Sequence, residues 1–484
     1  MKGALGLLGR DAVVYGLAGG VSRFVKVLLV PIVAKAFPAE TYGVFDALGV
    51  YTYLLAALGV LGLDSVVVLF AGQGRAGGTE DRGAAATQAL LLTAGTSALL
   101  ALAVIVGSEA WSALLLDSRA FGSAVAWAGA TVPFSSLLIF ALSLLKWEFR
   151  RGWYLVASLG SVVVSIGLTY LVAFHTAYGL PGLFAASLAG QAVGAGVALW
   201  GCRDLFARPG PARLARRMVA IGIPFALIAT AGAFTPSIDR FFVVRFASLE
   251  SAGLYGVGQK IAALTALVLS GFQAAWGPFA VGMRDAAGRD RLFSRVLLLV
   301  AVWGVCLVTL LSLAAPTLAA VLATPMYAAG ADVVPPLALA AVLTTVYFVV
   351  SIGSFLEGRS LRNLGAYAAG IAVTIALNAA LATAGTSPVA IAWANCAGQA
   401  VAVVFMAALS HRVHPIAFPF TATAVVLAAG AGLASLAAAA GRSLPRPLVA
   451  LALPGTVIAF GLVTWFAILQ PAERRAIRGF RRPA

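Results

Sequence analysis

Long uninterrupted apolar runs dominate the chain, and short polar stretches separate them. The runs extend about 20 to 25 residues, the length that an α-helix needs to cross roughly 30 Å of hydrocarbon. The pattern predicts an all-α polytopic membrane protein with about fourteen transmembrane helices. The predicted spans cover residues 12–36, 42–70, 83–107, 120–145, 152–175, 180–202, 218–245, 251–282, 292–322, 333–356, 363–384, 387–410, 418–440 and 447–469. Prolines inside several spans are expected to kink them, namely Pro31, Pro133, Pro224, Pro236 and Pro278.

Composition narrows the class further. Hydrophobic residues make up 61% of the 484 residues and charged residues only 10%, with a mean hydropathy of +0.99. A soluble domain carries about a quarter charged residues, so a soluble enzyme or a nucleic-acid binder is excluded. The three cysteines lie in or beside apolar runs and show neither a disulfide framework nor metal-ligand spacing. We therefore expect no cofactor and no metal ion.

The basic residues indicate the orientation of the chain. Most of the 33 lysines and arginines fall in alternate loops once the N-terminus is placed on the cytoplasmic side. An excess of Lys and Arg marks the cytoplasmic loops of a membrane protein. We expect both termini to be cytoplasmic, an even number of spans, and residence in the cytoplasmic (inner) membrane of a bacterium.

A short motif recurs after about 210 residues, which is typical of a two-lobed transporter built from a repeat. The corresponding positions are Lys35 and Arg245, Glu40 and Glu250, Tyr42-Gly43 and Tyr255-Gly256, and Asp46 and Gln259. We predict an N-terminal lobe of helices 1–6 (1–202), a basic cytoplasmic linker (203–217) and a C-terminal lobe of helices 7–12 (218–410). Residues 411–484 would add helices 13 and 14 and a basic tail. Six helices per lobe give the two lobes the same orientation, a parallel repeat.

Two cations lie near the middle of the first predicted span. Arg23 and Lys26 are three residues apart and share one helix face. A cation at the centre of a bilayer costs at least a few kcal/mol, so both side chains should face a wet cavity. We favour anion binding there. The alternative is a structural ion network with Asp46 or Asp64 of the second span.

Further charges interrupt the apolar runs of helices 7 and 8, at Asp239-Arg240 and at Lys260. A cavity made cationic by Arg23, Lys26, Arg240 and Lys260 would attract a phosphate-bearing substrate. Three carboxyl groups, those of Asp46, Asp64 and Asp239, are candidates for ion coupling or for ion pairs. Asp64 is the one closest to the inner surface.

Residues 217–261 resemble a known family. The segment contains Gly222-Ile223-Pro224, then Asp239-Arg240, then Gly253-Leu254-Tyr255. This pattern is similar to helices seven and eight of Wzx-type polysaccharide flippases, members of the multidrug/oligosaccharidyl-lipid/polysaccharide exporter superfamily. Pro31 and Glu40-x-Tyr42-Gly43 also match. Residues 383–394 depart from the stretch that many members carry, which affects the subfamily rather than the fold.

The resemblance implies a transporter rather than an enzyme. Such proteins move a polyprenyl-diphosphate-linked oligosaccharide from the cytoplasmic to the outer leaflet, for O-antigen or exopolysaccharide assembly. The implied partners are the lipid-linked glycan, the lipid bilayer and the polysaccharide polymerase machinery. A coupling ion, proton or sodium, would fit alternating access between the lobes.

Other functions stay open at this point. A cation-coupled multidrug exporter of the same superfamily would have more acidic cavity residues, and a lipid II flippase would share the substrate chemistry. A membrane glycan polymerase or ligase would need a sizeable outer loop, whereas the outer loops here are short. A membrane protein without transport activity is the remaining alternative.

Overall fold

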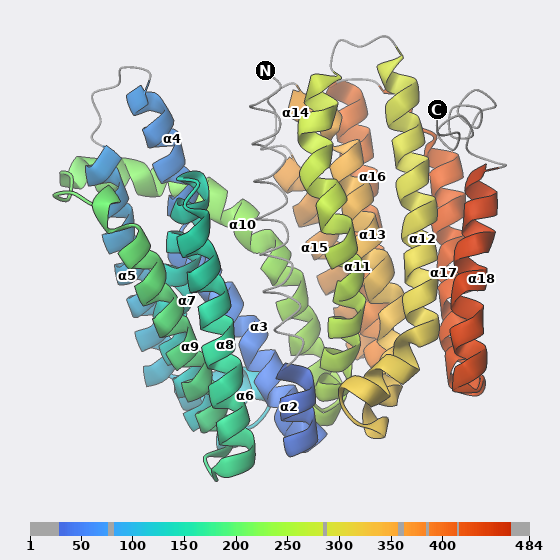
Figure 1. The fold of residues 1–484 in the computed structure, drawn as a ribbon, viewed down its shortest axis with the longest axis horizontal. Helices are drawn as coiled ribbons and strands as arrows, with labels where there is room; N and C mark the ends of the chain where they lie inside the picture. Colours follow the sequence, from blue (N-terminus) through green and yellow to red (C-terminus); the bar gives the residue numbers. More distant parts are fainter. Residues whose placement is uncertain are drawn as a thin grey trace, which may run out of the picture. The chain divides into compact units, whose positions relative to one another are not determined.

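The computed structural model describes residues 29–75, 82–283, 288–356, 363–383, 387–413 and 416–465. All regular secondary structure in these ranges is helical (Figure 1). Contacts divide the chain into two compact units, Met1–Gly256 and Val257–Ala484. The division into repeat-related lobes at residues 203–217 stays a prediction.

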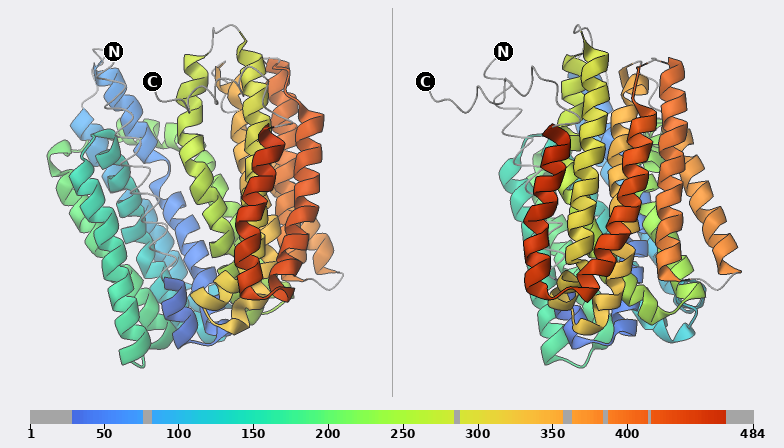
Figure 2. Two further views of the ribbon diagram at one scale, coloured as in Figure 1. Left: turned by 45° about the vertical axis from the view of Figure 1, so that its right-hand side comes forward. Right: turned by 90° about the vertical axis from the view of Figure 1, so that its right-hand side faces the viewer.

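The N-terminal unit is a bundle of long helices in which α7 packs against α3, α5 and α9, and α8 packs against α9. Figure 2 shows these helices from two further sides. The helices are α2 (Leu29–Ala36), α3 (Ala39–Val60), α4 (Leu63–Arg75), α5 (Arg82–Val106), α6 (Ser108–Leu116), α7 (Gly122–Trp147), α8 (Arg151–His175), α9 (Gly179–Gly201) and α10 (Ala212–Phe246), with 3₁₀ turns η1 (Arg119–Phe121) and η2 (Arg203–Leu205). Helix α11 (Leu249–Gly282) begins in this unit and continues into the next.

The C-terminal unit has α12 at its centre, in contact with α13, α17 and α18. Helix α16 packs against α13 and α15. The helices are α12 (Arg289–Leu322), α13 (Val334–Val350), α14 (Ile352–Leu356), α15 (Asn363–Ala382), α16 (Pro388–Val413), α17 (Phe420–Ser443) and α18 (Arg446–Val463), with the 3₁₀ segment η3 (Pro325–Val333) before α13.

Helix lengths confirm the polytopic membrane fold. Over the described ranges, 11 helices are long and apolar enough to cross a membrane, or up to 12 with the bent α10, and the apolar helix Pro447–Val463 is shorter. Each predicted span after the first has one of these helices as its counterpart. The first predicted span, 12–36, lies outside the described residues except for its end in α2.

Two spans are broken. The sequence suggested a continuous helix at the first break, whereas Pro224 and Pro236 predicted a kink in the second span. Helix α3 ends at Leu61 and Gly62, which have φ angles of 52° and 65°, and α4 continues the same span. Helix α10 bends by 57° between its halves Ala212–Leu227 and Gly232–Phe246. The α3–α4 break packs against the first half of α10, because a Cβ on Gly62 would lie 2.7 Å from the backbone oxygen of Gly222. Glycine at both positions is what allows this close approach.

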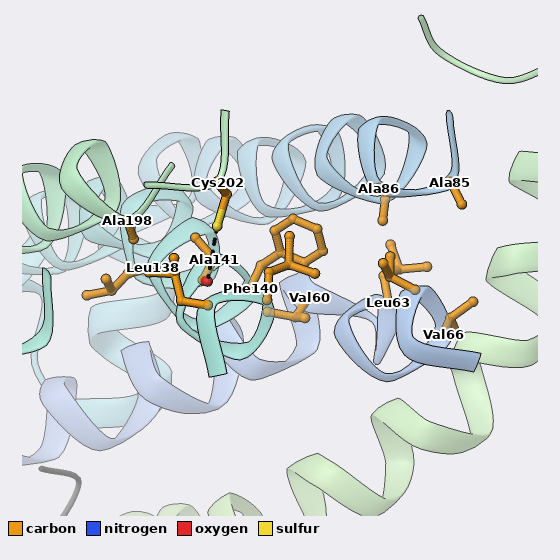
Figure 3. Close-up of a cluster of buried hydrophobic side chains, with 14 of the residues drawn as sticks. Val60, Leu63, Val66, Ala85, Ala86, Leu138, Phe140, Ala141, Ala198 and Cys202 are labelled. Atoms are coloured by element: carbon orange, nitrogen blue, oxygen red, sulfur yellow. Dashed lines mark hydrogen bonds between the residues drawn. The ribbon is translucent and has the colours of Figure 1, made fainter. Parts of the chain in front are cut away.

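A cluster of buried apolar side chains holds these broken helices in place (Figure 3). It combines Val60 and Leu63 on either side of the α3–α4 break with Phe140 of α7 and Met218 of α10, all at most 3% exposed. Close packing of buried side chains resists displacement. The first half of α10 is therefore fixed to the N-terminal unit.

Candidate functional site: a buried ionic cluster in the N-terminal unit

The two copies of the repeated motif each form a junction between helices. Lys35 lies in the last turn of α2 and Glu40 in the first turn of α3. Arg245 ends α10 in the same way, and Glu250 begins α11. Cations near a helix C-terminus and carboxylates near an N-terminus interact favourably with the helix dipole. This explains why the same charges recur at both junctions.

Small residues bring α3 and the start of α11 into backbone contact. A Cβ added to Gly43 would lie 2.1 Å from the backbone oxygen of Leu249, and one added to Gly253 would lie 2.3 Å from that of Ala39. Only glycine permits such an approach, as at the small-residue crossings of membrane helices. The second motif copy therefore packs directly on the first.

This crossing places an ion pair in the interior of the unit. Nε of Arg240 on α10 donates a hydrogen bond of 2.7 Å to Oδ2 of Asp46 on α3, and a terminal guanidinium nitrogen donates to the same oxygen. The side chains are 0% and 4% exposed. A Cβ on Gly256 would lie 2.8 Å from this carboxylate oxygen, so glycine is needed for α11 to pass beside Asp46.

A second hydrogen bond extends the cluster. The hydroxyl of Tyr255 donates to Oδ2 of Asp239 at 2.9 Å, and both side chains are buried. The guanidinium carbon of Arg240 lies 4.8 Å from the centre of the Tyr255 ring, close enough for a cation–π interaction. We call Asp46, Asp239, Arg240 and Tyr255 the ionic cluster.

The charges of the ionic cluster limit what it can do. One guanidinium faces two carboxyl groups in a place shielded from water, where charge is costly unless it is paired and hydrogen-bonded. In this conformation the Arg240 cation is bound to Asp46. The arrangement is therefore an ion pair that links α3 to α10 in the interior of the unit.

Of the seven candidate residues, the structure brings Asp46, Asp239 and Arg240 together. Lys260 follows on α11 in the part that belongs to the second unit, and Asp64 lies half-buried in the first turn of α4. Arg23 and Lys26 lie outside the described residues. The substrate-binding and coupling roles of all seven stay predictions. Sequence reasoning did not assign a role to Tyr255, although its place in the repeated motif was a signal.

A second charged group lies at the end of α9, beyond the membrane-spanning segments. The guanidinium of Arg150 forms a salt bridge with Asp204 and donates a hydrogen bond of 2.7 Å to the backbone oxygen of Gly201. The hydrogen bond from Arg150 lowers the pKa of Asp204 to about 2. Burial raises the pKa of the neighbouring Cys202 thiol to about 11. These contacts fix the start of the basic linker on the N-terminal unit.

No group of three or more His, Cys, Asp or Glu side chains in the described ranges could hold a metal ion. The ionic cluster has two carboxyl groups and no further ligand of that kind, so we derive no metal chemistry from it.

Comparison with known proteins places the chain in a family. The model of a family described as polysaccharide biosynthesis protein matches residues 32–285, just over half of the chain. No curated protein matches the sequence. The matched region includes the whole ionic cluster and both copies of the repeated motif.

Solved structures share the fold at low sequence identity. The lipid II flippase MurJ in an inward closed conformation matches with a TM-score of 0.74 and 12% identity, over 94% of this chain and 99% of that one. An inward-facing multidrug resistance MATE transporter of the MOP superfamily matches with 0.64 and 15%, over 83% and 94%. A MOP superfamily transporter from Pyrococcus furiosus, whose binding pocket is described as reversed in polarity, matches with 0.54 and 13%, over 83% and 95%.

Proposed function

The chain belongs to the polysaccharide biosynthesis protein family, and from this premise we propose that it moves a polyprenyl-diphosphate-linked oligosaccharide across the bacterial cytoplasmic membrane for the assembly of cell-surface polysaccharide. Family membership is the observation that carries the proposal. The fold supports it, because it is that of flippases and transporters of the MOP superfamily. A flippase lets the polar head cross while the lipid tail stays in the bilayer.

The proposed substrate contacts are cationic. A diphosphate needs cations, and arginine and lysine supply bidentate and point-charge contacts respectively. Arg23, Lys26 and Lys260 are the side chains that we assign to the diphosphate and to acidic sugars. In this assignment Arg240 binds the substrate only after its ion pair with Asp46 has broken.

The ionic cluster supplies a switch for alternating access. Asp46 and Arg240 belong to α3 and α10, two spans that both contain a break. We assign the ion pair to the state in which these spans are held together. Competition between the substrate phosphate and Asp46 for Arg240 would favour the other state, because a ligand shifts an equilibrium only through its different affinity for the two states. Protonation of Asp46 or Asp239 would act in the same direction.

The orientation follows from the basic loops. We propose that both termini are cytoplasmic and that the basic linker faces the inner leaflet. The substrate would then enter from the side on which lipid-linked sugars are built, and the polysaccharide polymerase machinery would use it on the other side.

A second candidate is the flipping of lipid II. The MurJ structure aligns with 94% of this chain, whereas the MATE structure aligns with 83%. Lipid II also consists of a glycan on a polyprenyl diphosphate, so the same cationic contacts would serve it. The two candidate substrates differ in the glycan that is attached to the polyprenyl diphosphate.

The test is mass spectrometry of polyprenyl-diphosphate-linked saccharides in a strain that lacks the gene. We expect a lipid-linked oligosaccharide to accumulate and the intact gene to remove it, while Arg23→Ala/Lys26→Ala does not. Rescue by this double variant would refute the cationic site but not the flippase. Accumulation of lipid II would favour the second candidate, and no accumulation together with drug sensitivity would favour a multidrug exporter.

A further inference from the structure

An apolar pocket of about 750 Å³ lies within the C-terminal unit. Its walls are α16 and α17, and its floor is formed by Leu297 of α12 and by Leu339, Leu343 and Val346 of α13. The size is that of a small-molecule site rather than of a packing defect. The pocket is separate from the ionic cluster, which belongs to the N-terminal unit.

Small side chains at helical spacing create the pocket. Helix α17 contributes Ala424, Ala428 and Ala431, which share one face because they are three and four residues apart. Helix α16 presents alanines in the same way at 397, 400, 407 and 408. Helix α16 packs closely against α13 and helix α17 against α12, and the alanines leave the space between α16 and α17 unfilled. Larger residues at these positions would close the pocket.

The apolar lining of the pocket favours an apolar ligand. The lining residues are almost all alanine, leucine, valine, tryptophan or phenylalanine. Two of them, His411 and Cys396, have titratable side chains. A sugar or a diphosphate would lose its hydrogen bonds to water there without replacement. Ala424 and Ala428 are exposed on the surface of a span, so the pocket is open to hydrocarbon. A lipid chain fits this surface.

Basic residues gather at one end of the pocket. His411 and Arg412 lie in the last turn of α16, and both are exposed. The start of α12, with arginines at 289, 291 and 295, lies at the same end, because Oγ of Ser294 donates a hydrogen bond of 2.6 Å to the backbone oxygen of Ala417 just before α17. Basic pockets between membrane helices on the cytoplasmic side bind anionic lipid headgroups.

We propose that this pocket binds one acyl chain of an anionic glycerophospholipid whose headgroup phosphate lies at Arg412 and His411. The apolar walls hold the chain, and the basic end selects the charge of the headgroup. The lipid belongs to the bilayer and is not the transported substrate, so the inference is independent of the proposed function.

The experiment uses the full-length protein in detergent, with phosphatidylglycerol, phosphatidylcholine and undecaprenyl phosphate as probes. Native mass spectrometry measures the bound lipid. Phosphatidylglycerol with brominated acyl chains locates it, because Trp393 lines the pocket and bromine quenches tryptophan fluorescence at short range. The variant Ala428→Phe fills the pocket. Ala429→Phe is the matched control, since residue 429 is exposed on the same helix and does not line the pocket.

We expect the wild type and Ala429→Phe to retain phosphatidylglycerol in preference to phosphatidylcholine, and Ala428→Phe to lose it. Arg412→Ala should remove the preference, and the quenching should be smaller in Trp393→Phe than in the wild type. Retention unchanged in Ala428→Phe, or equal retention of both phospholipids, would overturn the proposal. Displacement of phosphatidylglycerol by undecaprenyl phosphate would also overturn it, in favour of a site for the substrate tail. A thermal unfolding scan of Ala428→Phe confirms that the variant is folded.

Discussion

The buried ion pair between Asp46 and Arg240 makes a quantitative prediction for Asp46→Asn. The two side chains are 4% and 0% exposed, so the substitution leaves a guanidinium in the interior without its carboxylate. Removing one partner of such a pair costs about 3–5 kcal/mol. Because Asp239 still acts on the Arg240 charge, we expect the lower end, about 3 kcal/mol. The measurement is the free energy of unfolding in detergent, from a denaturant titration followed by tryptophan fluorescence.

The chain offers a matched control for this prediction. Asp117 forms a salt bridge with Arg245, and the side chains are 55% and 47% exposed. Asp117→Asn removes the same charge, and asparagine tolerates the left-handed backbone at this position. An exposed pair contributes about 0–1 kcal/mol. Asp46→Leu/Asp239→Asn/Arg240→Met removes all three buried charges of the ionic cluster and should recover much of the loss. An Asp46→Asn loss no larger than that of Asp117→Asn would refute the reasoning.

Three further predictions concern the N-terminal unit. Gly43→Ala should lower the thermal unfolding temperature, because its Cβ would lie 2.1 Å from a backbone oxygen of α11, whereas Gly49→Ala on the same helix meets nothing within 4 Å and should not. Cys202 should react slowly with a maleimide at pH 7, since burial raises its thiol pKa to about 11; mass spectrometry of the labelled protein against its denatured form checks this. The pKa of Asp204 is lowered to about 2, below the value near 4 of an unfolded chain, so the pair with Arg150 stabilises the fold above pH 4 and this contribution disappears as the pH falls through 2. The stability difference between wild type and Asp204→Asn should therefore be constant from pH 5 to 8 and shrink in acid; a difference that grows in acid would contradict the assignment.

The positions of the membrane helices could be read from the sequence because each span must be apolar over its whole length. Run lengths alone located the spans that correspond to α5, α7, α8 and α9. The short helix α6 was missed, because it lies between two spans and a helix of this length leaves no hydrophobic signature. The break between α3 and α4 was also missed, because Leu61 and Gly62 are apolar and a left-handed turn does not change hydropathy.

The candidate site was predictable in part. Asp46, Asp239 and Arg240 stood out because ionisable residues inside spans are costly and therefore need partners. That Asp46 pairs with Arg240 was not predictable, since it depends on the close crossing of α3 and α11 at Gly43 and Gly253. The repeated motif contained those glycines, but a repeat in the sequence does not indicate whether its two copies are in contact in the fold.

The central claim is tested most directly with the purified protein in liposomes that contain a polyprenyl-diphosphate-linked oligosaccharide. A membrane-impermeant glycosidase added outside measures how much substrate becomes accessible over time. The account predicts that the protected inner-leaflet fraction is consumed with wild-type protein and stays protected with Arg23→Ala/Lys26→Ala and without protein. If the wild-type protein leaves that fraction protected in vesicles where it is folded and inserted, the chain is not a flippase for this class of lipid.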